Sequence, residues 1–185
     1  TTSAKFAVMS KSPLTGRIND SLSSSSFAIA GKKTGFDAIV VTGQSKSRCA
    51  LVIDEGEVKF ADAEPVWGLS SRETEEKLPV EIGSGFRIAS IGPAGENRVH
   101  FATVSNEGRH AGRGGLGAVM GSKNLKAIAV RGSKLASYAH PKELNAYAKD
   151  LSRKSFGPAT EKYRELGTVS NLLTFNRLGT LPTRN

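Results

Sequence analysis

Cysteine and histidine are scarce in this chain of 185 residues, which has one cysteine, Cys49, and histidines only at positions 100, 110 and 140. A lone cysteine excludes an internal disulfide and is typical of a reducing compartment, so we expect a cytoplasmic protein. It also excludes a self-sufficient structural zinc or iron–sulfur site, which takes several thiolate or imidazole ligands. The histidines show no metal-ligand spacing. Cys49 itself lies in a strand-like run and is predicted to be a small buried hydrophobe.

Long hydrophobic runs and clustered aromatic residues are also missing. No apolar run approaches the ~18 residues that a membrane span needs, and nothing resembles a signal peptide. The eight phenylalanines, three tyrosines and one tryptophan are spread along the chain, and none lies in a basic–aromatic motif. We therefore expect neither a membrane nor a nucleic acid as partner. The net charge of +9 leaves open a solvated surface, an acidic partner or a phosphorylated small molecule.

Glycine, in contrast, is abundant, and 20 glycines indicate turns, bulges and close backbone approaches instead of a helical bundle. Between them, apolar and alternating runs predict a series of short strands. Asp54-Glu55-Gly56 predicts a hairpin between two of these strands, 12–16 predicts a turn, and the serine-dense segment 19–26 predicts a polar loop. The predicted strands cover residues 4–9, 37–41, 50–53, 57–60, 86–91, 99–104 and 127–130.

Helical signals are concentrated in the last third of the chain. Before that, only the capping-box spacing of Ser70 and Glu73 predicts a helix, over 73–78. After residue 132, Pro141 is placed to begin a helix, and further helical patterns cover 160–166 and 169–176. We therefore predict an α+β chain. A sheet-rich domain with mixed or antiparallel strands covers 1–133, and the opening helices of an α-helical domain cover 134–185.

The segment 109–117, RHAGRGGLG, is the strongest candidate for a binding site. Four glycines in six positions let successive backbone N–H groups converge on one point, which is how anion-binding nests form. Arg109 and Arg113 add charge and bidentate donors, and Lys123 and Lys126 follow as two further cations. The alternative is a tight glycine turn beside a sheet with solvated arginines. Neither a Walker loop nor a dinucleotide fingerprint matches the spacing.

Other polar features are weaker signals. The glycine turn 92–97 is predicted to be a hairpin connection between two strands. The hydroxyl run 23–26 offers donors to phosphate oxygens, although such runs are more often mobile loops. Glu96 is a candidate general base for which no partner residue can be placed from the sequence.

Together these segments resemble the first domain of the aldehyde ferredoxin oxidoreductase family. The resemblance rests on SKSPLTG (10–16), GFDAIVVTGQS (35–45), IGPAGENRVHFA (91–102) and RHAGRGGLGAVMGSKNLKAIAVRGSK (109–134), in the family's order. The segment 178–185 resembles the start of the family's second domain. By this resemblance the chain is part of a longer polypeptide whose beginning and C-terminal domains are missing here.

The resemblance implies a sheet-rich base that carries a tungsten-bis-pterin cofactor. The pterin phosphates meet at a magnesium ion, and a [4Fe–4S] cluster lies alongside, its cysteine ligands outside this chain. Such enzymes oxidise aldehydes to carboxylic acids and pass the electrons to ferredoxin. Their acid/base residues and most of the substrate pocket belong to the later domains, so no catalytic residue is expected in this chain.

Carried over residue by residue, the resemblance also names positions that face the cofactor. Lys5 and Arg109 match two family arginines between pterin and cluster. The main-chain oxygens of Leu22 and His110 match the magnesium contacts, and 113–115 completes the glycine cradle. The full set is Lys5, Leu22, Ser23, Ser24, Arg109, His110, Ala111, Gly112, Arg113, Gly114 and Gly115.

This chain departs from the family pattern at three places. Lys5 replaces an arginine, and lysine lacks the planar fork of a guanidinium. Ser24 and Ser25 stand where two glycines are usual. The segment 106–109 is one residue shorter than usual.

Three hypotheses follow for the function. The chain is part of a tungsten or molybdenum pterin oxidoreductase, completed by its other domains and served by ferredoxin and an aldehyde substrate. Alternatively it is a truncated or separate subunit that binds a pterin or another anion without activity of its own, or an inactive remnant. Homo-oligomerisation is open under each of them.

Overall fold

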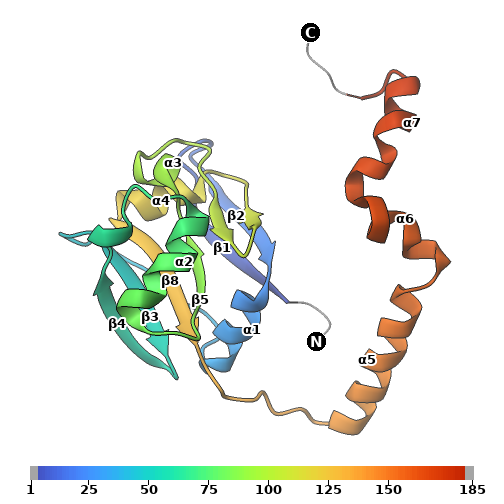
Figure 1. The fold of residues 1–185 in the computed structure, drawn as a ribbon, viewed down its shortest axis with the longest axis horizontal. Coiled ribbons are helices and arrows are strands. Elements are labelled where there is room, and N and C mark those ends of the chain that lie inside the picture. The colour runs from blue at the N-terminus through green and yellow to red at the C-terminus, as the bar shows by residue number, and fades with distance from the viewer. Residues whose placement is uncertain (1–3, 182–185) are drawn as a thin grey trace. The chain divides into compact units, whose positions relative to one another are not determined.

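The computed structural model describes residues 4–181 of the chain. They form two units, one that ends at Ala136 and one that begins at Ser137. The first unit combines strands and helices and the second is helical, so the predicted α+β class is confirmed (Figure 1). The division into domains at residues 133 and 134 stays a prediction. No helix among residues 4–181 is both long and apolar enough to cross a membrane.

The first unit is built on a mixed six-stranded sheet, counted over the described residues, with the order β4-β3-β8-β5-β6-β7. β3 and β8 are parallel, and the other neighbours in this sheet are antiparallel. A hairpin of β1 and β2 forms a separate two-stranded sheet. The strands are β1 (Lys5–Lys11), β2 (Ile18–Ser24), β3 (Cys49–Asp54), β4 (Glu57–Asp62), β5 (Arg87–Ser90), β6 (Val104–Asn106), β7 (Arg109–Ala111) and β8 (Leu125–Arg131).

Helices cover both faces of the six-stranded sheet. Because strand side chains alternate, Leu51 and Ile53 pack with α1 and α4 on one face, while Ala50 and Val52 pack beneath α2 on the other. Figure 1 shows α2 crossing its face of the sheet. The helices are α1 (Ser26–Lys33), η1 (Glu64–Val66), α2 (Ser71–Ile82), α3 (Pro93–Glu96), α4 (Leu116–Ser122), α5 (Pro141–Ser155), α6 (Pro158–Leu166), η2 (Gly167–Asn171) and α7 (Leu172–Arg177).

Several local predictions are confirmed. The β3–β4 hairpin turns at Glu55 and Gly56, both with positive φ. Ser70 and Glu73 form the reciprocal capping box, although the helix behind them runs four residues beyond Leu78, to Ile82. In the second unit, α5 begins at Pro141 and the helical structure is interrupted before Pro158, as predicted. No residue of α5, α6 or α7 is buried within the described chain. The predicted stop at Pro182 lies outside the described residues.

The predicted loop over 19–26 is wrong, because most of it is strand β2. Its residues pair with β1 from Lys5↔Ser24 to Lys11↔Ile18. The strand lacks apolar alternation, since its two fully inward positions are the buried serines Ser21 and Ser23. Their hydroxyls are satisfied by partners from distant parts of the chain, which no local pattern reveals.

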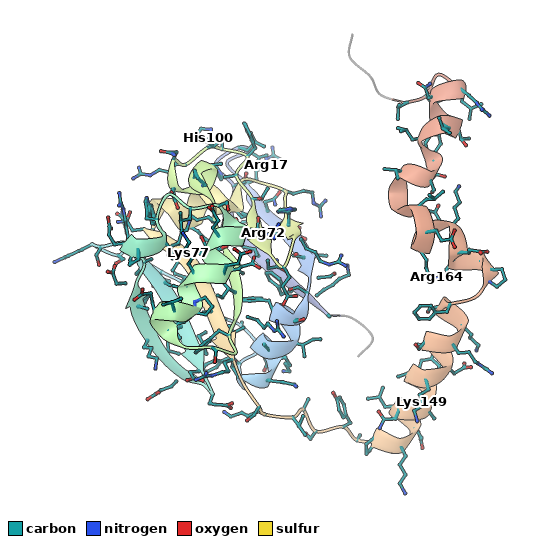
Figure 2. All side chains as sticks on the ribbon, viewed as in Figure 1. Arg17, Arg72, Lys77, His100, Lys149 and Arg164 are labelled. Atoms are coloured by element: carbon teal, nitrogen blue, oxygen red, sulfur yellow. The ribbon has the colours of Figure 1, made fainter. Side chains whose placement is uncertain are left out.

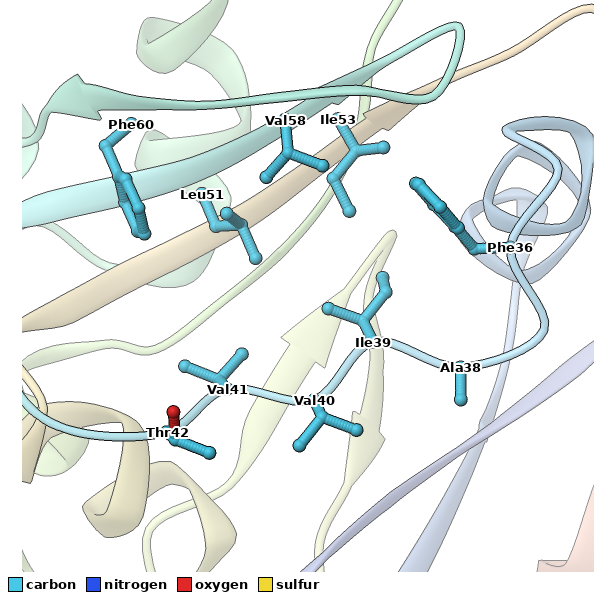
Figure 3. A pocket seen from close by; sticks show the side chains of 10 residues that line it. All are labelled: Phe36, Ala38, Ile39, Val40, Val41, Thr42, Leu51, Ile53, Val58 and Phe60. Carbon is cyan, nitrogen blue, oxygen red and sulfur yellow. The ribbon is translucent and has the colours of Figure 1, made fainter.

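The predicted strand over 37–41 is also wrong, although the side chains of this segment point alternately to opposite sides, as in a strand. Figure 3 shows Ile39 and Val41 pointing toward β3 and β4, while Ala38 and Val40 point away. Val40 is 83% exposed. A strand requires a neighbour that completes the hydrogen-bond ladder, and no described residue pairs with this segment.

Segment 92–104 differs from its prediction as well. The glycine turn 92–97 forms the single-turn helix α3 instead of a hairpin connection, with Pro93 at its start. Residues 99–103 form no strand, and the strand begins only at Val104. The two neighbouring strands still pair antiparallel through Ser90 and Ser105.

An ion pair joins the ends of the parallel strands β3 and β8. The Arg131 guanidinium donates from Nε to Asp54 Oδ1 at 2.8 Å and from Nη2 to Oδ2 at 2.6 Å. These hydrogen bonds hold the pKa of Asp54 below its ordinary value of 3.8. The ionised carboxylate therefore stabilises the fold above pH 3.8, and this contribution is lost as the pH falls through the lower, folded-state pKa.

At about pH 7 we expect Asp54→Asn to unfold at a lower urea midpoint than the wild type. At about pH 3 the gap between the two midpoints should be smaller. The gap narrows because, below pH 3.8, the unfolded wild-type chain takes up a proton on Asp54 that the folded protein still resists, so the stability of the wild type falls. Asp20→Asn is the control, since Asp20 is exposed and forms no ion pair within residues 4–181. A gap that stays constant with pH would contradict the assignment.

Candidate functional site

A glycine loop between β7 and α4 forms the candidate site, here called the cradle (residues 112–115). Gly114 and Gly115 have φ of 76° and 69°, two successive left-handed residues. A Cβ on Gly115 would lie 1.8 Å from the carbonyl oxygen of His100, and one on Gly114 would lie 2.3 Å from Asn19 Nδ2. His100 lies in the loop after α3 (Figure 2). Only glycine fits this path at positions 114 and 115.

The β1–β2 hairpin is tied to the cradle by serine side chains of β2. The backbone N–H of Arg113 donates to Ser21 Oγ at 3.0 Å, and Asn106 Nδ2 donates to Ser23 Oγ at 2.9 Å. The prediction that the Ser23 hydroxyl is available to phosphate is therefore wrong, because it is buried and already bonded. Between these anchors Leu22 is 48% exposed.

The two predicted main-chain metal positions lie on adjoining strands. β2, which carries Leu22, contacts β7, which carries His110. His110 is exposed, and its Nδ1 lies 2.8 Å from Ser105 Oγ on the paired strand. Ala111 is fully buried, so its side chain belongs to the core and only its backbone can face a ligand.

The family departures make contacts of their own. Lys5 Nζ donates to Ser24 Oγ at 3.1 Å, across the first pair of the hairpin. Ser25 caps α1 by accepting from the backbone N–H of Phe27 at 3.1 Å. The side chains that replace the usual glycines are thus used for a lysine contact and a helix cap.

The short segment 106–109 is a two-residue hairpin turn. Glu107 and Gly108 both have positive φ, 46° and 72°, as a type I′ turn requires. The turn joins β6 to β7 and places Arg109 at the start of the strand that leads into the cradle.

Two arginines beside the cradle are available to a ligand. Arg109 and Arg113 are exposed, and neither guanidinium forms an ion pair with a carboxylate of residues 4–181. Lys123 and Lys126, predicted as further cations, are not free. Lys123 Nζ donates to the Gly43 carbonyl at 2.7 Å, and Lys126 is buried in an ion pair with Glu96. The partner of Glu96, which could not be placed from sequence, is therefore Lys126.

Other basic side chains project from both units, for example Arg72 and Lys77 on α2 and Lys149 on α5 (Figure 2). Positive charge is consequently not confined to the cradle, and charge alone does not mark the site. What distinguishes Arg109 and Arg113 is their place on β7 and in the glycine loop that follows it. Within residues 4–181, no group of three or more His, Cys, Asp or Glu side chains is placed to hold a metal ion.

A separate groove of about 370 Å³ lies between segment 36–42 and the β3–β4 hairpin (Figure 3). It continues into a hollow of about 320 Å³ beside Cys49, which is buried as predicted. The first groove has no charged lining residue, so it does not suit an anion. Its lining consists of Phe36, Ala38, Ile39, Val40, Val41, Thr42, Leu51, Ile53, Val58 and Phe60.

Comparison with known proteins gives the cradle its context. Residues 1–132 match the family model described as aldehyde ferredoxin oxidoreductase, N-terminal domain. The whole chain is 41% identical to a tungsten-containing aldehyde ferredoxin oxidoreductase of Pyrococcus furiosus and 43% identical to that of Thermococcus kodakarensis. In both cases it spans 31% of the relative's length.

More distant relatives have other names. The WOR-like subunit of an aliphatic sulfonate oxidoreductase from Pyrococcus furiosus is 34% identical over 89% of this chain and 28% of its own. The active-site complex BamBC of benzoyl coenzyme A reductase, solved with 1,5-dienoyl-CoA, superposes with a TM-score of 0.79 at 34% identity. That match covers 83% of this chain and 24% of the other. On the family model and these relatives, the chain belongs to the aldehyde ferredoxin oxidoreductase family.

Proposed function

We propose that this chain supplies the pterin- and phosphate-binding base of a tungsten-pterin oxidoreductase that oxidises aldehydes to carboxylic acids with ferredoxin as acceptor. The observation that carries the proposal is the cradle, which accepts only glycine at 114 and 115 and includes Arg113, with Arg109 nearby on β7; neither guanidinium forms an ion pair within residues 4–181. The tungsten-containing relatives, identical at 41–43% of positions, support tungsten as the metal of the cofactor. Molybdenum is the alternative metal, since the pterins and not this chain would hold it.

The residues present fit a phosphorylated cofactor. Backbone N–H groups of the cradle other than that of Arg113, which donates to Ser21 Oγ, would donate to anionic oxygens without needing a side chain. A Cβ would collide with the Asn19 side chain at 114 and with the His100 carbonyl oxygen at 115. The guanidiniums of Arg109 and Arg113 add charge-assisted, forked hydrogen bonds. When bound, the tungsten-pterin group would supply the two-electron oxidation chemistry, and a [4Fe–4S] cluster with ligands outside this chain would take up the electrons.

The neighbouring positions orient the cofactor. Main-chain oxygens of Leu22 and His110 would hold a magnesium ion, since hard cations prefer oxygen ligands. Lys5, with Ser24 beside it at 3.1 Å, would present a point charge toward the pterin where a forked guanidinium is usual. The remaining domains of the polypeptide would complete the enzyme.

We expect Arg109→Ala to reduce the tungsten that copurifies with the protein roughly tenfold, because a hydrogen bond to a charged group contributes about 1.5–3 kcal/mol. The measurement is the tungsten-to-protein ratio after anaerobic purification from the natural source. Arg72→Ala is the matched control, because Arg72 is an exposed arginine on α2. Unchanged tungsten in Arg109→Ala would remove Arg109 from the site.

A second candidate is a separate pterin- or anion-binding subunit without activity of its own. It is favoured by the names of two relatives, one a WOR-like subunit and the other an active-site complex. Elemental analysis separates the candidates. Tungsten with about four iron atoms per tungsten supports the oxidoreductase, whereas a pterin without iron supports the subunit.

A further inference from the structure

A buried ion pair lies in the same unit as the cradle. Lys126, in β8, is completely buried, is paired with Glu96, and donates from Nζ to the Leu69 carbonyl at 2.8 Å. The Glu96 side chain is 5% exposed, and both its oxygens accept from the backbone N–H of Gly68, at 2.9 and 3.0 Å. The pair thus fastens the end of α3 to the sheet and to the loop before α2.

α3 in turn fixes α4 through direct backbone contacts. A Cβ on Gly121 would lie 1.9 Å from the Gly95 carbonyl oxygen, and one on Gly95 would lie 3.1 Å from that of Gly117. The N–H of Gly117 also donates to the Ala102 carbonyl at 3.0 Å. Because α4 starts directly after Gly115, any shift of α3 is transmitted to the cradle.

We propose that Glu96 and Lys126 are a positioning pair for the cradle. They fix α3, and through its glycine contacts with α4 they hold the cradle's N–H groups in the arrangement that binds phosphate. Neither side chain reaches a ligand, since both are buried. The inference rests on the proposed function, and it adds two residues to the site that no motif identifies.

The alternative is that the pair only contributes to stability, and replacement of both charges separates the two roles. A buried ion pair can often be exchanged for apolar residues of similar volume without loss of stability. In Glu96→Leu/Lys126→Met no charge is left buried and unpaired, so folding is expected to be largely retained. The apolar side chains cannot bond to the Gly68 N–H or the Leu69 carbonyl, so α3 loses its anchors.

The experiment compares tungsten content and unfolding temperature in the purified protein and three variants. The double variant is expected to unfold near the wild-type temperature but to keep about a tenth of the tungsten or less, as for outer residues that orient a metal site. Glu96→Gln keeps one acceptor oxygen for the Gly68 N–H, so it should retain more tungsten than the double variant. Leu78→Ala, in the core beneath α2, should lower the unfolding temperature and leave tungsten unchanged.

The outcomes distinguish the inference from its premise. Full tungsten in the double variant, or tungsten that follows the unfolding temperature across all variants, would overturn the positioning role. Wild-type protein without tungsten would overturn the proposed function, and the positioning role with it.

Discussion

Gly115→Ala is expected to destabilise the fold by about 3 kcal/mol or more and to abolish cofactor retention. Two effects add at this position. A left-handed φ of 69° disfavours any side chain, and the new Cβ would lie 1.8 Å from the carbonyl oxygen of His100. A backbone atom cannot rotate away as a side chain can, so either α4 or the loop after α3 must shift. Thermal unfolding and the tungsten-to-protein ratio measure the two consequences.

Gly43→Ala is the matched control for this prediction. Gly43 has nearly the same φ, 68°, but a Cβ there would have nothing within 4 Å. The control therefore carries only the cost of the left-handed conformation, about 1–2 kcal/mol, and leaves the cradle intact. Equal losses in Gly43→Ala and Gly115→Ala would show that the close approach to His100 is not what requires glycine.

The second large effect is expected for Glu96→Ala, which leaves the Lys126 ammonium buried without a counter-charge. Removing one partner of a buried ion pair costs about 3–5 kcal/mol, and only the Leu69 carbonyl would still accept from Nζ. The double variant Glu96→Leu/Lys126→Met should recover most of this loss. Urea unfolding of the single and double variants measures the free energies directly.

The loss in Glu96→Ala should also depend on pH. Burial lowers the pKa of Lys126 below its ordinary 10.5, and Glu96 opposes that shift. Without Glu96 the folded state releases the proton at lower pH than the unfolded state does. The unfolded state then binds more protons, so the variant should gain stability as pH rises toward 10.5.

The control for the size of the loss in Glu96→Ala is Glu64→Gln, which breaks the exposed pair with Arg48 and should cost at most about 1 kcal/mol. A loss in Glu96→Ala no larger than in this control would contradict the buried-pair account.

Local features of the cradle were predictable because glycine itself encodes them. Successive glycines at 114 and 115 permit left-handed backbone whatever surrounds them, and both residues adopt it. The β3–β4 hairpin and the capping box of Ser70 were also predictable, because each depends on residues at most a few positions apart. The motif 109–134 was long enough to identify the family.

Strand β2 and segment 37–41 show where local patterns fail to predict the structure. Ser21 and Ser23 read as a polar loop, because the groups that satisfy them, the Arg113 N–H and Asn106, lie more than eighty residues later. Segment 37–41 shows the reverse error, since its continuous apolar run predicts a strand but no described strand pairs with it.

By itself, then, the sequence determined the family, the α+β class and the glycine conformations of the cradle. Tertiary structure decided which charges near the cradle are free. Lys126 reads as one more surface cation until β8 places it against Glu96, thirty residues earlier, whereas Arg109 and Arg113 have no such carboxylate among residues 4–181. The physical reason is that burial of a charge depends on the partner that long-range packing brings to it, and spacing along the chain does not encode that partner.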